Sequence, residues 1–145
     1  MNRMRVVYID NCCNSRLFDG DPSPKVKAQA DKVRLIINNR KMDGYIVIGS
    51  FVGEAEISKI PDDEKRRAAE QSYKESIDDN IQHSPQIIAR ARKLESMGLK
   101  PMDARHLAAA EAAGADFLLT TDEKFIKRCA KNNLTAVKII DPLDF

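Results

Sequence analysis

An Ala-rich helix that leads directly into a short apolar strand is the feature that most constrains how this chain can fold. Residues 102–113 read MDARHLAAAEAA, and both Ala and Leu favour the helical state. Gly114 follows, which predicts a left-handed helix end. The next apolar run, residues 117–120, has the length of a strand that is covered on both faces. A helix followed by such a strand indicates a parallel sheet in an α/β fold.

The rest of the chain repeats this alternation of strands and helices. Apolar strands are also expected at residues 5–9, 45–48 and 136–140. Helices are expected at residues 24–39, from Ser50 onward, at 61–80, 84–97 and 103–113, and at 122–131. The heavily charged 61–80 segment reads as a solvated helix or as part of a cover over the sheet. This order predicts one three-layer α/β/α domain with a central parallel sheet over residues 1–145.

Composition narrows the function classes only a little. The formal net charge of +2 allows a polyanion to bind only through a local basic patch. No apolar run reaches the roughly 18 residues that a transmembrane helix needs, and the N-terminus lacks signal-peptide features, so we expect a cytoplasmic protein with no membrane partner. The three cysteines, an odd number with no C-x-x-C pair, argue against a disulfide framework and against structural zinc.

Acidic residues stand where predicted strands and helices begin or end. Asp10 follows the first strand, Asp103 opens the Ala-rich helix, and Asp122 follows the strand after it. Ligands of open α/β sheets bind beyond the carboxyl ends of the strands. If residues 5–9 and 117–120 form neighbouring parallel strands, Asp10 and Asp122 share one edge of the sheet.

A glutamate after the second strand can join these acids. Glu54 and Glu56 both follow Ser50, but successive helical residues are about 100° apart, so the two side chains point about 200° apart. Only one of them can face the same site.

Each candidate also has a structural interpretation. Asp103 and Asp122 are equally consistent with helix N-caps, and an N-cap can have a second role. Glu54 and Glu56 are typical of a solvated helix surface, and His106 is as consistent with a packed histidine as with a substrate contact. Cys12 and Cys13 are interpreted as packing residues, because Phe18 and Asp19 stand where a Cys-x5-Arg phosphatase needs arginine. Four basic residues near the acids in sequence either meet phosphates or keep the surface soluble: Arg16, Lys59, Arg105 and Lys124.

Clustered carboxylates imply a cation. Four such groups repel one another, so at least one pKa rises unless a positive charge is present. Oxygen ligands suit Mg²⁺ or Mn²⁺ rather than zinc. Such an ion activates water and neutralises charge on a phosphate undergoing substitution, which favours phosphodiester hydrolysis.

The sequence resembles the PIN-domain nucleases, a family that includes the VapC-like toxins of toxin-antitoxin pairs. Four segments carry the resemblance: YIDNCCNSRLFD at residues 8–19, IGSFVGEAEISKIP at 48–61, MDARHLAAAEAAGADFLLTTDEKF at 102–125, and VKIIDPLDF at 137–145. They occur in the order of the family and together span nearly the whole chain, from residue 8 to residue 145. The resemblance implies a metal-dependent endoribonuclease that cuts RNA with Mg²⁺ or Mn²⁺. It also implies a possible antitoxin partner and a homodimer, as is common among relatives.

The family's functional residues transfer to this sequence one by one. The resemblance implies that the metal ligands and catalytic acids are Asp10, Glu56, Asp103 and Asp122, with Glu54 as the alternative to Glu56. Ser50 and Thr121 match small polar positions that support ligands or water, and Glu123 matches an assisting acid. Asn11, Cys12 and Arg105 depart from the family pattern, which bears on substrate preference rather than on metal binding.

Two other functions compete with the nuclease. One is a catalytically weak PIN-like module that binds RNA or protein through an empty or weak metal site. The other is a phosphotransfer domain with Asp10 as nucleophile. The second ranks low, because Cys12 stands where the common dehalogenase-type pattern has a second Asp.

Overall fold

A five-stranded sheet with the order β3-β2-β1-β4-β5 forms the centre of the computed structural model, which describes residues 3–10 and 23–145. All four strand pairs are parallel. The elements are β1 (Arg5–Ile9), α2 (Pro24–Asn38), α3 (Arg40–Asp43), β2 (Tyr45–Ser50), α4 (Phe51–Ser58), α5 (Asp63–Ser76), β3 (Asp79–Ile81), α6 (Pro85–Ser96), α7 (Pro101–Ala112), β4 (Phe117–Leu119), α8 (Glu123–Asn132), β5 (Lys138–Ile140) and the 3₁₀ turn η1 (Pro142–Asp144).

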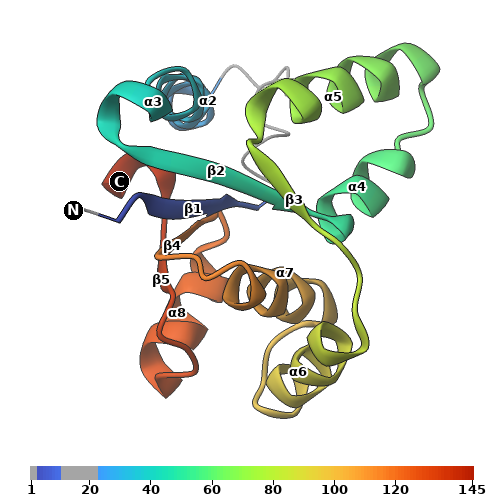
Figure 1. Ribbon diagram of the computed structural model, residues 1–145, viewed down its shortest axis with the longest axis vertical. Coiled ribbons are helices and arrows are strands. Elements are labelled where there is room, and N and C mark those ends of the chain that lie inside the picture. Colours follow the sequence, from blue (N-terminus) through green and yellow to red (C-terminus); the bar gives the residue numbers. More distant parts are fainter. Residues whose placement is uncertain (1–2, 11–22) are drawn as a thin grey trace.

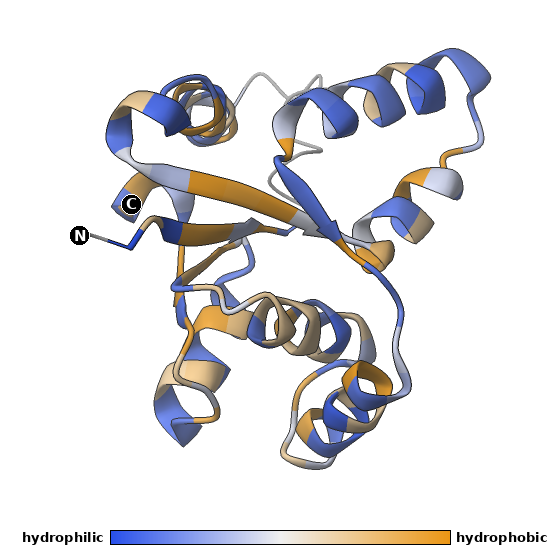
Figure 2. Cartoon of the chain, viewed as in Figure 1, coloured by the Kyte–Doolittle hydropathy of each residue, from blue (hydrophilic) through white to orange (hydrophobic). Residues whose placement is uncertain are grey.

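Helices cover both faces of this sheet. In Figure 1, α2 and α3 lie on one side of the strands, and α6, α7 and α8 lie on the other. Figure 2 shows the matching hydropathy, with the most apolar ribbon along β1 and β2. The predicted three-layer arrangement with a central parallel sheet is therefore confirmed. Among the helices of the described residues, none is long and apolar enough to cross a membrane.

Side-chain alternation along β1 divides the core into two. Val7 and Ile9 pack with the apolar face of α2, whereas Tyr8 packs with α6 and α7. Successive residues of a strand point to opposite faces, so β1 contributes to both cores at once. The two neighbours of β1 are β2 and β4, as the shared edge proposed for Asp10 and Asp122 requires.

The edge strand β3 corrects the sequence prediction for residues 61–80. We expected helix up to about Asn80, but α5 ends at Ser76 and residues 79–81 pair with β2. This strand has only three residues, two of them Asp79 and Asn80, so no apolar run marks it. Its strand geometry comes from hydrogen bonding to the edge of β2, which local sequence does not encode.

Tyr73 of α5 fastens the helix pair α4 and α5 to the end of β2. Its hydroxyl accepts a hydrogen bond from Ser50 N at 2.7 Å and donates to Ser50 O at 3.0 Å. The phenol lies directly over Gly49, where an added Cβ would come within 2.2 Å of the hydroxyl oxygen. Glycine is needed at position 49 to admit the ring, so α4 leaves the sheet at a position set by Tyr73.

We predict that Tyr73→Phe lowers the free energy of unfolding by about 1–2 kcal/mol, because the buried Ser50 N–H loses this acceptor. Tyr45→Phe is the matched comparison, since the Tyr45 hydroxyl donates only to Ile36 O, at 2.6 Å. Urea unfolding of both variants and the wild type measures the difference. A smaller loss in Tyr73→Phe than in Tyr45→Phe would show that Tyr73 does not anchor α4.

Candidate metal centre

The parallel register brings the ends of three strands together. Tyr8 pairs with Ile48 on β2 and with Leu118 on β4. Two residues later along each strand, Asp10 therefore lies between Ser50 and Thr120. Side chains two residues apart on a strand point to the same face, so Asp10, Ser50 and Thr120 point to the α7 side of the sheet, as Tyr8 does.

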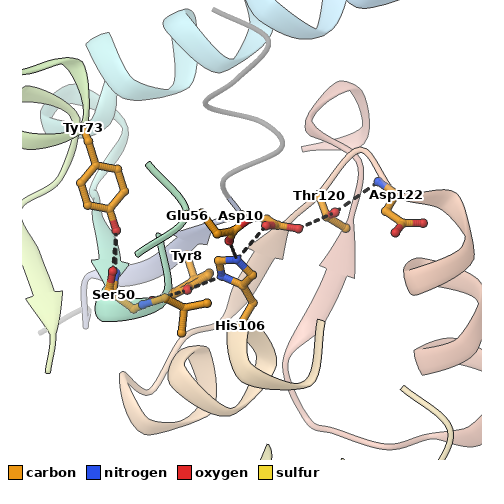
Figure 3. A network of polar contacts seen from close by, with 9 residues as sticks. Tyr8, Asp10, Ser50, Glu56, Tyr73, His106, Thr120 and Asp122 are labelled. Carbon is orange, nitrogen blue, oxygen red and sulfur yellow. Dashed lines mark hydrogen bonds and ion pairs between the residues drawn. The ribbon is translucent and has the colours of Figure 1, made fainter. Parts of the chain in front are cut away.

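Asp10 is bound to the neighbouring strand end by its side chain and its backbone. The carboxylate is 6% exposed, and its Oδ2 accepts a hydrogen bond from Thr120 Oγ1 at 3.0 Å. Its backbone N–H donates to Leu119 O, also at 3.0 Å. Thr120 Oγ1 in turn accepts from the backbone N–H of Asp122 at 3.2 Å (Figure 3). Thr120 therefore links the two strand-end acids.

Helix α4 points Glu56 into this site. Ser50 is the N-cap of α4, as predicted, and its Oγ accepts from Val52 N at 3.1 Å. Glu56 then contacts Nε2 of His106, and the same nitrogen lies 3.2 Å from Asp10 Oδ1. The Glu54 side chain instead accepts a hydrogen bond from Asn80 on β3. The structure thus brings Glu56, and not Glu54, to Asp10.

His106 belongs to a buried chain of hydrogen bonds. Its Nδ1 lies 2.6 Å from the hydroxyl of Tyr8, which lies 2.6 Å from Ser50 Oγ (Figure 3). When Asp10 and Glu56 are ionised they can only accept, so Nε2 carries the hydrogen in this arrangement. Burial raises the pKa of Tyr8 well above its ordinary value, which keeps the phenol protonated.

The surroundings of Asp103 raise the pKa of its carboxyl group. Burial, followed by the negative charges of Asp10 and Asp122, raises its pKa from 3.8 to about 6. The N-cap interpretation of this residue is wrong, because Lys100 is the N-cap of α7 and Asp103 lies in the first turn. Asp103 is therefore within electrostatic reach of two other acids without a capping role.

Asp122 does cap a helix. Its Oδ1 accepts hydrogen bonds from Lys124 N at 3.0 Å and from Phe125 N at 3.2 Å, which makes it the N-cap of α8. The structural interpretation is thus confirmed. The carboxylate still acts on Asp103 electrostatically, so capping fixes its orientation near the other acids.

The donor atoms fit a divalent cation. One ligand atom each from Asp10, Glu56 and His106 lie within 4.8 Å of one another, a separation that a single ion can bridge. Carboxylate oxygens and an imidazole nitrogen are common ligands of such ions. Asp103 and Asp122 add negative charge beside Asp10. The metal-ligand and catalytic roles of Asp10, Glu56, Asp103 and Asp122 stay predictions.

Sequence reasoning did not find Tyr8 and Thr120, and it left His106 undecided. The spacing along the sequence could have indicated them. Tyr8 precedes Asp10 by two residues and Thr120 precedes Asp122 by two, and residues two apart share a face of a strand or of the chain that continues it. His106 lies three residues after Asp103, about one helical turn. Choosing between packing and function there required the tertiary contacts.

The remaining sequence candidates lie elsewhere. Thr121 is half-buried, and the hydroxyl that bonds Asp10 is that of Thr120. Glu123 forms an exposed ion pair with Lys25 at 3.0 Å. Three of the basic candidates, Lys59, Arg105 and Lys124, are exposed. Four other candidate residues lie outside the described part of the chain: Asn11, Cys12, Cys13 and Arg16.

Comparison with known proteins places this arrangement in a family. The sequence model of the PIN-domain family matches residues 7–131, which include all four predicted acids. The chain belongs to the PIN-domain family. Among curated protein sequences, none gives a significant match.

Two solved structures share the fold of this PIN domain. The crystal structure of VapBC2 from Rickettsia felis, bound to a DNA fragment from its promoter, matches with a TM-score of 0.61 and 16% identity, over 94% of this chain and 97% of the other. VapC20 of Mycobacterium tuberculosis, a toxin that cleaves the sarcin-ricin loop, matches with a TM-score of 0.55 and 14% identity, over 91% and 98%. The arrangement of the sheet and helices described above is therefore similar to that of these two structures.

The raised pKa of Asp103 predicts how stability without metal depends on pH. The folded protein holds this proton more tightly than the unfolded chain, so ionised Asp103 disfavours folding increasingly as pH rises from about 4 through about 6. In EDTA, the unfolding free energy of Asp103→Asn relative to wild type should rise by about 1 kcal/mol between pH 4 and pH 7.5, after allowance for solvent screening.

Urea unfolding at the two pH values measures this change. Asp63→Asn is the control, because Asp63 is an exposed acid in the first turn of α5 and should not show the rise. A pH-independent difference for Asp103→Asn would contradict the electrostatic clustering of the three aspartates.

Proposed function

We propose that this PIN domain is a metal-dependent endoribonuclease that uses Mg²⁺ or Mn²⁺ and acts as the toxin of a toxin-antitoxin pair. The observation that carries the proposal is the position of Asp10. It lies at the carboxyl edge of the sheet, where His106 Nε2 contacts both Asp10 and Glu56. The charge of Asp10 also acts on Asp103. Acids from β1, α4 and α7 thus meet where ligands of parallel sheets bind, and Asp122 stands beside them.

The proposed ligands are Asp10, Glu56, Asp103 and Asp122. A bound divalent ion would activate a water molecule and offset charge on the phosphate. The protein's own part is to hold the acids in place before substrate arrives. Thr120 fixes one oxygen of Asp10, and the capping bonds from Lys124 N and Phe125 N fix Asp122.

The burial and charges of the site support the proposed cation. Asp103 has a raised pKa because burial, and after it the negative charges of Asp10 and Asp122, disfavour its ionisation. A divalent cation would reverse that effect and lower the pKa, so that all the acids are ionised together. The cation would thereby relieve the repulsion that otherwise opposes folding.

Family and structural neighbours support the substrate and the partner. VapC20 is described as a toxin that cleaves the sarcin-ricin loop, and VapBC2 was solved bound to a DNA fragment from its promoter. By analogy we propose an RNA substrate, a cognate antitoxin protein, a homodimer and a cytoplasmic location for this chain. Which RNA is cut follows from surface residues rather than from the acids.

We predict that the purified protein cleaves RNA in the presence of Mg²⁺ or Mn²⁺ and that EDTA abolishes this cleavage. Asp10→Asn and Glu56→Gln should each lower the cleavage rate by roughly 100-fold or more, because each removes a charged ligand and keeps the side-chain size. A gel assay with a mixture of structured and single-stranded RNAs measures the rates.

Glu54→Gln is the matched control for Glu56→Gln. It makes the same chemical change two residues away on α4, at a side chain that contacts Asn80 instead of the site. It should cleave at the wild-type rate. Metal-independent cleavage, or equal loss in both glutamate variants, would contradict the proposed site. If the protein binds RNA but does not cleave it with any divalent metal, the result would favour the alternative function, a catalytically weak binding module.

A further inference from the structure

His106 is the central side chain of the site that the proposed chemistry leaves without a role. It is 1% exposed, and it lies on α7 one turn after Asp103. Its Nε2 faces two of the proposed metal ligands, at 3.2 Å from Asp10 Oδ1 and in contact with Glu56 Oε1. An imidazole nitrogen is itself a common metal donor, so this position has a consequence for the ion.

We propose that His106 Nε2 is a nitrogen ligand of the divalent ion held by Asp10 and Glu56, and that it makes this site prefer Mn²⁺ to Mg²⁺. The inference rests on the metal-dependent function proposed above and deepens it. It assigns a ligand that the pattern of acids does not contain.

The three donor atoms lie close together. They come from the end of β1, from α4 and from α7, and all lie within 4.8 Å of one another. The imidazole has a fixed orientation because it is fully buried and packs edge-on against the Tyr8 ring, with centroids 5.7 Å apart. A rigid nitrogen donor facing two carboxylates is a preformed ligand set.

Ligation requires a lone pair on Nε2, and the surrounding hydrogen bonds can supply it. Without an ion, Nε2–H donates to the carboxylates, Tyr8 donates to Nδ1, and Ser50 Oγ donates to Tyr8. With an ion bound, the ring would adopt its other neutral tautomer: the Nε2 proton would be released to solvent and Nδ1 would take up one proton from solvent, so the charge of the ring would be unchanged. Nδ1–H then donates to the Tyr8 hydroxyl, which donates to Ser50 Oγ. A hydroxyl can serve in both directions, whereas a carbonyl or an amide N–H cannot.

The Tyr8 hydroxyl also has the place expected of a group that supports a ligand. Metal-binding histidines generally donate their second ring N–H to a fixed acceptor, which sets the tautomer and the ring orientation. Tyr8 lies 2.6 Å from Nδ1 and is held by Ser50.

A nitrogen donor changes which ion the site prefers. Mg²⁺ favours oxygen ligands and keeps several waters, whereas first-row transition ions accept imidazole readily. A site of carboxylates alone would not separate Mg²⁺ from Mn²⁺ in this way. The expected signature is a His106-dependent gain in Mn²⁺ affinity.

Pulsed electron paramagnetic resonance of bound Mn²⁺ tests the ligand directly. The chain has two histidines, His83 and His106, so labelling with ¹⁵N-histidine leaves only two candidate sources of nitrogen coupling. We expect ¹⁵N coupling of a directly bound nitrogen in the wild type and in His83→Gln, and its loss in His106→Gln. His83 is a suitable control because it is exposed and packs only edge-on with Phe51 among ring contacts of the described residues.

Titration of Mn²⁺ and Mg²⁺ tests the preference. His106→Gln should weaken Mn²⁺ binding roughly 10-fold or more, with a smaller effect on Mg²⁺. Tyr8→Phe should weaken Mn²⁺ binding roughly 10-fold while keeping the nitrogen coupling, because the ligand remains and loses only its acceptor.

The outcomes separate this inference from the proposed function. Bound Mn²⁺ without histidine coupling in the wild type would overturn the nitrogen ligand and leave the metal-dependent nuclease standing; His106 would then only position the acids. No Mn²⁺ binding by the wild type would overturn both. Since the wild-type spectrum decides the ligand by itself, the test holds even if His106→Gln fails to fold.

Discussion

A carboxylate buried at the end of the central strand is the constraint on which the rest of this structure depends. Asp10 has almost no exposed surface, and a buried charge is tolerated only with hydrogen-bonding or charged partners. Thr120 supplies a hydroxyl from the end of β4, and His106 supplies a ring nitrogen from α7. Each partner belongs to a different element, so satisfying one side chain fixes how a strand end and a helix meet the sheet.

The same residues hold the fold together and shape the site. Ser50 caps α4 through its side chain, bonds the Tyr8 hydroxyl, and receives Tyr73 at its backbone. The first contact directs the helix that carries Glu56, and the second orients His106. The third attaches α5. Changes at Ser50 would therefore alter stability and metal geometry together, which is the reason that the two have to be measured separately.

Local signals allowed much of the fold to be predicted. Buried apolar runs identified β1, β2 and β4, and Ser84 followed by Pro85 marked the start of α6, where Ser84 Oγ accepts from Ile87 N. The angle between Glu54 and Glu56 allowed only one of them to face the site, the resemblance selected Glu56, and the contacts agree with that choice. For the strands and the helix start, a pattern over a few neighbouring residues was sufficient. The chemical roles of the acids remain predictions.

What could not be predicted depends on residues distant in sequence. The strand β3 has no apolar run, and its geometry comes from β2. Pro101 occupies the first helical position of α7 and shifts the cap to Lys100, so Asp103 lies further inside the helix than the capping interpretation assumed. His106 lies on a helix face that is buried throughout, where helical spacing alone does not separate a packed residue from a ligand.

The wide separation of the acids along the chain has a consequence for synthesis. Thr120, which secures Asp10, follows it by 110 residues along the chain and is therefore made later. The central strand cannot pair with β4, and its buried carboxylate cannot bond to Thr120, until residues 117–120 have left the ribosome. Contacts so distant in sequence also form late in folding, because a long loop must close first. A growing or truncated chain that lacks β4 and Thr120 thus cannot complete the hydrogen bonding of Asp10.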